Sequence, residues 1–404
     1  MFEASEFMGV RAAGVKSACI TLSVLFGTLA LASCSSSDHA TSRSLVSAPA
    51  PQAPGTLPPR LDLSPARFVD LPDWRNDQHA EALAALKRSC PKFSKQNPAQ
   101  PVGSAFTFGR AGQWQELCAA AFLVPAGNGP ARAFFERWFV PYRAHDGVDD
   151  MGLFTGYYEP VLRGSWVRTS RYAVPIYRLP PEAAAGAAGR KSSGPALPSR
   201  AQIDRGALSG RGLELLWIDD PVDAFFLHIQ GSGIVQMQDG ALVRIGFAGK
   251  NGHPYVPIGA ELIQRGEIAR EDMSMQAIRT WLAGHPGEST RLMQSNPSYV
   301  FFDFVSGDGP KGAQGVALTA GRSMAVDPQF VPYGVPLWLD TSDPIANQPM
   351  RRLVVAQDTG GAIRGPVRGD LFCGSGATAG ATAGLMKQEG RWYLLLPKAA
   401  VAAS

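Results

Sequence analysis

Three aspartates near the C-terminus, Asp327, Asp358 and Asp370, each terminate or follow an apolar run. A carboxyl group at the end of a buried strand is partly desolvated, which raises its pKa and lets it hold a proton near neutral pH. Such an acid can protonate the leaving oxygen of a glycosidic bond. Aspartate followed by Thr, Pro or Gly is also common in turns, so spacing alone favours a turn role for most of the three.

Other segments have side chains suited to sugars. Tyr157 and Tyr158 stand in an aromatic segment, 152–158, that is typical of a strand, although strand aromatics are more often core residues than sugar platforms. Gln230-Gly231-Ser232-Gly233 follows a run that is expected to be a buried strand, and Asn251-Gly252 is typical of a tight turn. Their side chains could bind sugar hydroxyls, but the residues alone favour a structural role.

Several other chemistries lack their motifs. The sequence has no GxSxG, GxxxxGK[ST], CxxC or HExxH pattern, and none of its six histidines has an obvious triad partner. A serine hydrolase, a P-loop nucleotide site and a zinc site are therefore not indicated. The formal net charge of +4, without a dense Lys/Arg block, gives no support for nucleic-acid binding.

The pattern changes along the chain. Residues 71–139 carry apolar residues at helical spacing, and from residue 152 strands dominate, with 213–218, 224–230 and 242–247 expected as strands. Helices are expected at 257–265 and 274–282. From residue 299 short apolar runs alternate with Gly, Pro and Asp, which indicates a barrel of short strands, and the small-residue segment 374–384 is expected to be a loop.

The N-terminus has the order of an export signal: Arg11 and Lys16 precede a short apolar run at 18–30. The run ends in Leu31-Ala32-Ser33-Cys34, which resembles the lipobox of bacterial lipoproteins and implies lipidation of Cys34 after removal of residues 1–33. Residues 34–67 are rich in Ser, Ala and Pro and indicate a tether of roughly 30 Å. Ser35 is not the Asp that retains such proteins at the inner membrane, so the resemblance implies an outer-membrane lipoprotein facing the periplasm. An ordinary cleaved signal with a chance cysteine is the alternative.

Three cysteines remain once Cys19 and Cys34 are assigned to the signal and the lipid. In an oxidising periplasm Cys90 and Cys118 could form a disulfide between two helices, which would leave Cys373 unpaired.

Many segments resemble, in order, the membrane-bound lytic murein transglycosylase A family. The matching segments are 154–158, 197–200, 229–233, 249–253, 271–279 and 296–302. The tail, from 321–327 to 358–370, is similar to the 3D domain, which is named for three aspartates. This resemblance implies a mainly β protein with N-terminal helices. A double-psi β-barrel is expected from residues 68–160 and 297–404, with a smaller β domain inserted at 161–296 and the glycan in a groove between them.

The resemblance also assigns roles to residues. Asp370 matches the family's catalytic acid, Asp358 a second carboxylate of the same groove, and Asp327 the first, supporting aspartate. Sugar-binding positions are implied at Thr155, Gly156, Tyr157, Tyr158, Gln230, Gly231, Ser232, Gly233 and Asn251.

The implied reaction cleaves the β-1,4 bond between N-acetylmuramic acid and N-acetylglucosamine and leaves 1,6-anhydromuramic ends, without a metal or organic cofactor. Its implied partners are peptidoglycan strands and the lipid anchor, and cell-wall synthases or amidases are candidates. Two alternatives stay open: an inverting hydrolase on the same barrel with Asp358 as base, and a non-catalytic glycan-binding lipoprotein.

Overall fold

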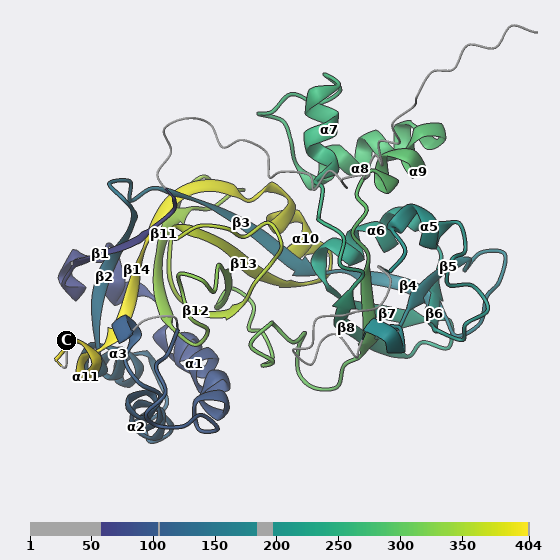
Figure 1. Cartoon of the computed structure of the whole chain (residues 1–404). Coiled ribbons are helices and arrows are strands. Elements are labelled where there is room, and N and C mark those ends of the chain that lie inside the picture. Colours follow the sequence, from purple (N-terminus) through teal and green to yellow (C-terminus); the bar gives the residue numbers. More distant parts are fainter. Residues whose placement is uncertain (1–57, 104–105, 184–196, 403–404) are drawn as a thin grey trace, which may run out of the picture. The chain divides into compact units, whose positions relative to one another are not determined.

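The computed structural model describes residues 58–103, 106–183 and 197–402, which form two β-sheets with helices around them (Figure 1). The expected export signal, Cys34 and nearly all of the expected tether lie outside the described residues. Within the described ranges, no helix has the length and apolar character needed to cross a membrane.

The first sheet contains eight strands in the order β1-β2-β14-β11-β12-β10-β13-β3. An additional pairing of β14 with β3 closes six of them into a barrel. Two neighbouring pairs in this barrel, β10 with β12 and β13 with β3, are parallel, and the others are antiparallel. The strands of the sheet are β1 (Leu61–Pro65), β2 (Phe139–Asp146), β3 (Gly152–Glu159), β10 (Ser323–Val326), β11 (Pro336–Ser342), β12 (Pro349–Asp358), β13 (Arg368–Ser375) and β14 (Lys387–Pro397).

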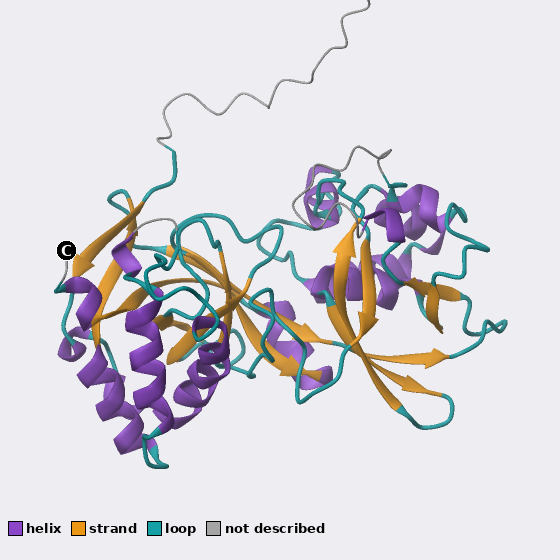
Figure 2. Cartoon of the chain, turned by 60° about the horizontal axis from the view of Figure 1, so that its bottom comes forward, coloured by secondary structure: helices purple, strands orange, loops and turns teal. Residues whose placement is uncertain are grey.

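Three helices cover one side of the barrel (Figure 2): α1 (His79–Phe93), α2 (Ala111–Phe122) and α3 (Asn128–Trp138). Their apolar faces and the barrel strands share one core cluster, in which Trp114 of α2 stacks on Phe93 of α1 at 4.8 Å between ring centroids. A disulfide joins Cys90 to Cys118 and so ties α1 to α2, as the sequence suggested. Cys373 is free.

The second sheet has its own core and forms the inserted domain. Its order is β5-β6-β4-β7-β8-β9, with strands β4 (Val161–Ser165), β5 (Val174–Tyr177), β6 (Glu214–Ile218), β7 (Ser232–Met237), β8 (Leu242–Lys250) and β9 (Val300–Phe304). In the described part of this domain the helices are α5 (Arg200–Asp204), α6 (Pro221–Gln230), α7 (Ile258–Gln264), α8 (Met275–Gly284) and α9 (Pro286–Gln294). The short helices α10 (Gly376–Leu385) and α11 (Lys398–Val401) belong to the C-terminal segment. The expected fold class, a barrel with an inserted β domain, is confirmed.

Two secondary-structure expectations were wrong. The segment 224–230 is helix α6 rather than a strand, because its ends carry helix signals: the Asp220 side chain accepts from the backbone N–H groups of Val222 and Asp223, and Gly231 ends the helix at φ 78°. Its apolar residues follow no clear period because they face two core clusters. The segment expected to be a loop at 374–384 is largely helix α10, whose Ala379 and Ala383 pack on Tyr158.

Two expected boundaries also shift. Strand β1 (Leu61–Pro65) lies inside the range 34–67 expected to be tether, and its pairing with β2 makes it part of the folded domain. Strand β9 (Val300–Phe304) pairs with β8, so the inserted domain extends beyond residue 296 into the range 297–404 expected for the barrel. Strand β3 of the first sheet ends at Glu159, and strand β4 of the second sheet begins at Val161.

Candidate active site

Asp370 lies in β13 directly opposite Thr155 of the parallel strand β3. The Thr155 hydroxyl Oγ1 donates to Asp370 Oδ1 at 2.7 Å, and it accepts from Arg368 Nη2 at 2.8 Å. A threonine hydroxyl has one hydrogen, so the bond from Arg368 leaves that hydrogen directed at the carboxyl group. Thr155 therefore fixes the orientation of Asp370 and connects it to a cation.

The second oxygen of Asp370 is available for chemistry. Among the described residues Oδ2 takes no hydrogen bond, and it is not one of the fully buried unpartnered atoms, so it keeps some exposure in an otherwise buried side chain. Burial raises the pKa of Asp370 to about 6, the nearby Asp358 charge adds to the rise, and the Thr155 hydrogen bond and Arg368 oppose it. Asp370 can thus carry a proton at mildly acidic pH and release it at neutral pH.

Asp358 ends β12 in a different environment. Its Oδ1 accepts from the backbone N–H groups of Ala313, at 2.8 Å, and Thr359, at 2.9 Å, while Oδ2 accepts from the Tyr157 hydroxyl at 2.8 Å. Burial raises the pKa of Asp358, and these three donors counteract that rise. Backbone N–H groups can only donate, so this carboxyl group is held as an acceptor on both oxygens.

The strand β3 presents its residues alternately to two sides. Thr155 and Tyr157 point to the side with the aspartates, and the pKa of Tyr157 is raised well above its usual value by burial and then by Asp358, so this phenol remains a donor. Gly156 and Tyr158 pack against α10, and a Cβ on Gly156 would lie 2.9 Å from the Cα of Ala383. Of the four expected sugar-binding positions in β3, Thr155 and Tyr157 therefore lie with the aspartates.

Asp327 is the turn residue among the three aspartates. It is only 2% exposed, and its carboxylate accepts from the backbone N–H groups of Gln329 at 3.1 Å and Gly365 at 3.0 Å. It therefore holds the loop that leads into β13.

The segment 230–233 meets β3 from the inserted domain. Gln230 Oε1 accepts from the backbone N–H of Tyr158 at 3.0 Å, Gly231 ends α6, and Ser232 and Gly233 are buried at the start of β7. Asn251 lies apart from this junction. Its amide donates to the carbonyls of Pro198 and Pro297 and accepts from the N–H of Tyr299, so its side chain holds loops together.

Two charged residues that contact the strands of the candidate site were not identified from the sequence. Arg368 contacts Thr155, which is 213 residues away, and no local pattern reports such a pairing. Glu159 is fully buried and accepts from Arg244 Nε at 2.8 Å and Ser375 Oγ at 2.6 Å, which joins β3 and β13 to β8 of the inserted domain. The sequence signal for Glu159 was its place at the end of the aromatic segment.

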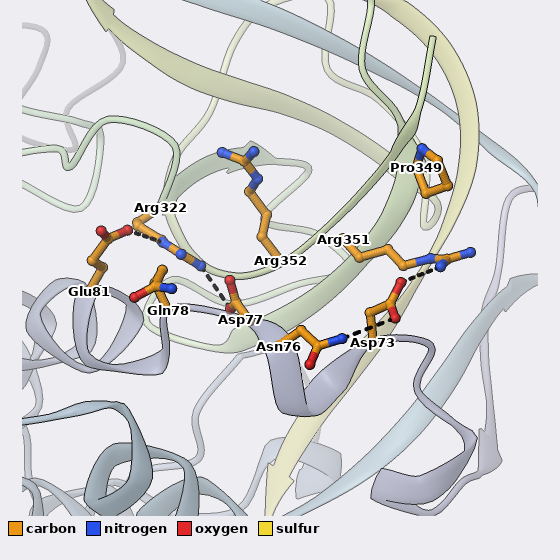
Figure 3. Close-up of a pocket in the computed structure, with 9 residues that line it drawn as sticks. All are labelled: Asp73, Asn76, Asp77, Gln78, Glu81, Arg322, Pro349, Arg351 and Arg352. Carbon is orange, nitrogen blue, oxygen red and sulfur yellow. Dashed lines mark hydrogen bonds and ion pairs between the residues drawn. The ribbon is translucent and has the colours of Figure 1, made fainter. Parts of the chain in front are cut away.

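A cavity of about 530 Å³ lies away from these residues, beside the start of α1 (Figure 3). Its side chains are mostly paired: Arg322 with Asp77 at 2.8 Å, and Arg351 with Asp73. None of the three aspartates lines it. We interpret it as an ion-pair cluster that ties the N-terminal helices to β12. The described residues contain no group of three or more His, Cys, Asp or Glu side chains that could hold a metal ion.

Comparisons with known proteins converge on one family. The MltA specific insert domain matches residues 153–303, and the 3D domain matches residues 322–396. Over 260 residues, 62% of this chain and 67% of the relative, the sequence is 42% identical to membrane-bound lytic murein transglycosylase A of Escherichia coli (strain K12).

Solved structures are similar as well. The membrane-bound lytic murein transglycosylase from Agrobacterium tumefaciens is 36% identical with a TM-score of 0.76, over 84% of this chain and 99% of that one. E. coli MltA with bound chitohexaose is 32% identical with a TM-score of 0.62, over 85% of this chain and 95% of that one.

Proposed function

Because the chain belongs to the membrane-bound lytic murein transglycosylase A family, we propose that it cleaves peptidoglycan with Asp370 acting first as acid and then as base. The bond cleaved is the β-1,4 link between N-acetylmuramic acid and N-acetylglucosamine. The chitohexaose bound by the E. coli relative supports a sugar polymer as the ligand of this fold.

The reaction balances without water. The proton on Asp370 Oδ2 passes to the glycosidic oxygen as the bond from that oxygen to C1 of muramic acid breaks. The C6 hydroxyl of the same sugar attacks C1 and returns its proton to Asp370. The product is a 1,6-anhydro end, and Asp370 is again protonated. An attacking group within the substrate has a high effective concentration, which favours it over water.

The difference between the two carboxyl groups carries this proposal. Asp370 has one oxygen free and a pKa raised to about 6, whereas both oxygens of Asp358 accept hydrogen bonds. A hydrolase would need Asp358 to activate water. Both oxygens of Asp358 already accept hydrogen bonds from the protein, which disfavours that role. We assign Asp358 the anionic role: its charge adds to burial, the main cause, in raising the pKa of Asp370, and it stabilises the positive charge that develops at C1.

The remaining contacts orient the substrate. We propose that Tyr157 and the 230–233 segment line the glycan site beside β3, with Thr155 orienting the acid. Asn251 supports the loops of the inserted domain, since its amide is used by backbone groups.

The test is digestion of purified sacculi by the wild type and by Asp370→Asn, followed by mass analysis of the muropeptides. We expect 1,6-anhydromuramic ends from the wild type and at most about a hundredth as many from the variant. Reducing-end sugars would establish the hydrolase instead. A wild type that binds sacculi without lysing them would establish the glycan-binding lipoprotein.

For location, we propose an outer-membrane lipoprotein that faces the periplasm and is anchored through Cys34, in keeping with the relatives' name "membrane-bound". Cell-wall synthases and amidases would be its neighbours there. Labelling with a fatty-acid analogue should mark the wild type and not Cys34→Ala. A labelled variant would disprove the anchor.

A further inference from the structure

The inserted domain contains a cavity of about 330 Å³ that the proposed reaction does not use. One face of α6 lines it with Pro221, Ala224, Phe225 and His228, spaced as one side of a helix. Arg200 of α5 lies in its wall. The volume is at the lower end of the range of small-molecule sites, about 300–1,000 Å³.

Arg200 is a buried cation that forms no direct ion pair among the described residues, although Asp204, in the same lining, acts on it as a nearby charge. It is 4% exposed and lies 4.9 Å from the Phe225 ring and 5.2 Å from the Tyr299 ring, measured from the guanidinium carbon to the ring centroids. Its Nη2 donates to the Ser298 carbonyl at 2.9 Å and to His228 Nδ1 at 3.1 Å, and no described carboxylate forms an ion pair with it. A buried charge that is not directly paired is costly, and Asp204 offsets only one of the two arginines of the lining, so an anionic ligand would complete the site.

Further donors surround this cation. Burial and the Arg200 charge lower the pKa of His228 well below its usual value, so its ring is neutral. Since Nδ1 accepts from Arg200, the hydrogen is on Nε2, and both this N–H and Arg200 Nε are buried without a partner among the described residues. Arg200 Nη1 makes no hydrogen bond there but is not fully buried, so it is the part of the guanidinium that meets the cavity.

We propose that this cavity binds the terminal carboxylate of a short peptide. The guanidinium supplies its charge and the Nη1 donor to an oxygen of a carboxylate. Tyr177 and Trp217 in the wall supply apolar contact to the adjoining residue, and Arg168 lies over the Trp217 ring at 5.6 Å. The two arginines outnumber the single acid of the lining, Asp204, so a singly charged anion balances the site.

The peptide stems of peptidoglycan are the source we assign, an assignment that rests on the proposed function. Helix α6 connects the cavity to the active-site strand, because His228 lines the cavity and Gln230 accepts from the backbone of Tyr158 in β3. A ten-residue helix spans only about 15 Å. A glycan beside β3 would therefore have its stem within reach of the cavity.

The experiment titrates the full chain with N-acetyl-alanyl-alanine and with its C-terminal amide, using calorimetry. We expect the acid to bind with a dissociation constant of about 1 mM, as a fragment-sized ligand does, and the amide at least tenfold more weakly. Arg200→Met removes the charge at similar volume, and Ala173→Trp narrows the cavity from an exposed lining position. Both should lose binding. Arg171→Gln, an exposed arginine outside the lining, should retain it.

Equal binding of acid and amide, or retained binding in both Ala173→Trp and a folded Arg200→Met, would overturn the site. A second arm tests the source: the free peptide should inhibit digestion of peptide-bearing strands and spare strands stripped of their stems. Equal inhibition of both would overturn the stem assignment. Calorimetry needs no turnover, so peptide binding without lysis counts against the proposed function alone, and lysis without peptide binding counts against the cavity alone.

Discussion

The end of β12 and the middle of β13 each place one aspartate in the same barrel, but with different surroundings. At the end of β12, three donors hold both oxygens of Asp358. In β13, one donor holds one oxygen of Asp370. The second oxygen has no donor among the described residues and is not fully buried. Burial raises the pKa of both groups. Desolvation alone therefore does not define an acid. The number and placement of donors decide which carboxyl group can move a proton.

The largest expected effect separates these two regions directly. Asp370→Asn removes the only group that we assign to proton transfer, and general acid–base catalysis contributes about 10²–10⁴-fold, so lysis should fall by that factor. Asp358→Asn keeps an oxygen for the backbone donors but loses the charge, and we expect a smaller loss of roughly 10–100-fold, equivalent to one or two pKa units of electrostatic stabilisation. Initial rates on sacculi give both values. A greater loss in Asp358→Asn than in Asp370→Asn would reverse the assigned roles.

The second effect concerns stability. Because burial raises the pKa of Asp370 to about 6 from 3.8, the folded state binds this proton more tightly than the unfolded state. The associated stability is fully present below pH 4 and is lost as pH rises through 6. A pKa that is about two higher in the folded state than in the unfolded state corresponds to roughly 3 kcal/mol of unfolding free energy. Asp370→Asn should therefore be more stable than the wild type at pH 8, by up to about 3 kcal/mol, and nearly equal at pH 4.

Denaturant unfolding of both proteins at the two pH values measures this difference. Asp340→Asn serves as the control. Asp340 lies in β11 and pairs with Arg351 at 2.8 Å, and two strands, β12 and β10, separate β11 from β13, which carries Asp370. Its neutralisation should not stabilise the protein at pH 8. If the difference in unfolding free energy between the wild type and Asp370→Asn is the same at pH 4 and pH 8, Asp370 ionises normally.

A third effect tests the hydroxyl in β3. The Thr155 hydrogen bond lowers the pKa of Asp370, so Thr155→Val should move the falling limb of the pH–rate profile above pH 6, by about one to two pH units, since a hydrogen bond to a charged group contributes about 1.5–3 kcal/mol. Thr155→Ser retains the hydroxyl and should keep the wild-type midpoint. If valine and serine variants share a midpoint, the hydroxyl does not set the pKa.

The sequence predicted these two regions unequally. Aspartates at the ends of apolar runs, the barrel of short strands and the Cys90–Cys118 pairing all depend on local patterns or general chemistry. The partners of Asp370 depend on register: Thr155 is 215 residues away, and only the family resemblance placed it in the site. Helix α6 was mistaken for a strand because a helix buried on two sides loses its amphipathic period. Helix α10 was mistaken for a loop because Gly and Ala contribute no such period.

The smallest expected effect tests Arg368, which no sequence pattern indicated. Its positive charge lowers the pKa of Asp370, but it reaches the carboxyl group only through the Thr155 hydroxyl. Arg368→Gln keeps a donor for Thr155 and removes the charge, so the pH midpoint should rise by less than in Thr155→Val, with kcat at low pH almost unchanged. Arg364→Gln, an exposed arginine of the loop that precedes β13, is the matched control. A lower rate at every pH with an unmoved midpoint would show that Arg368 only holds β13 against β3, whereas a raised midpoint shows that its charge, acting beside the Thr155 hydroxyl, lowers the pKa of Asp370.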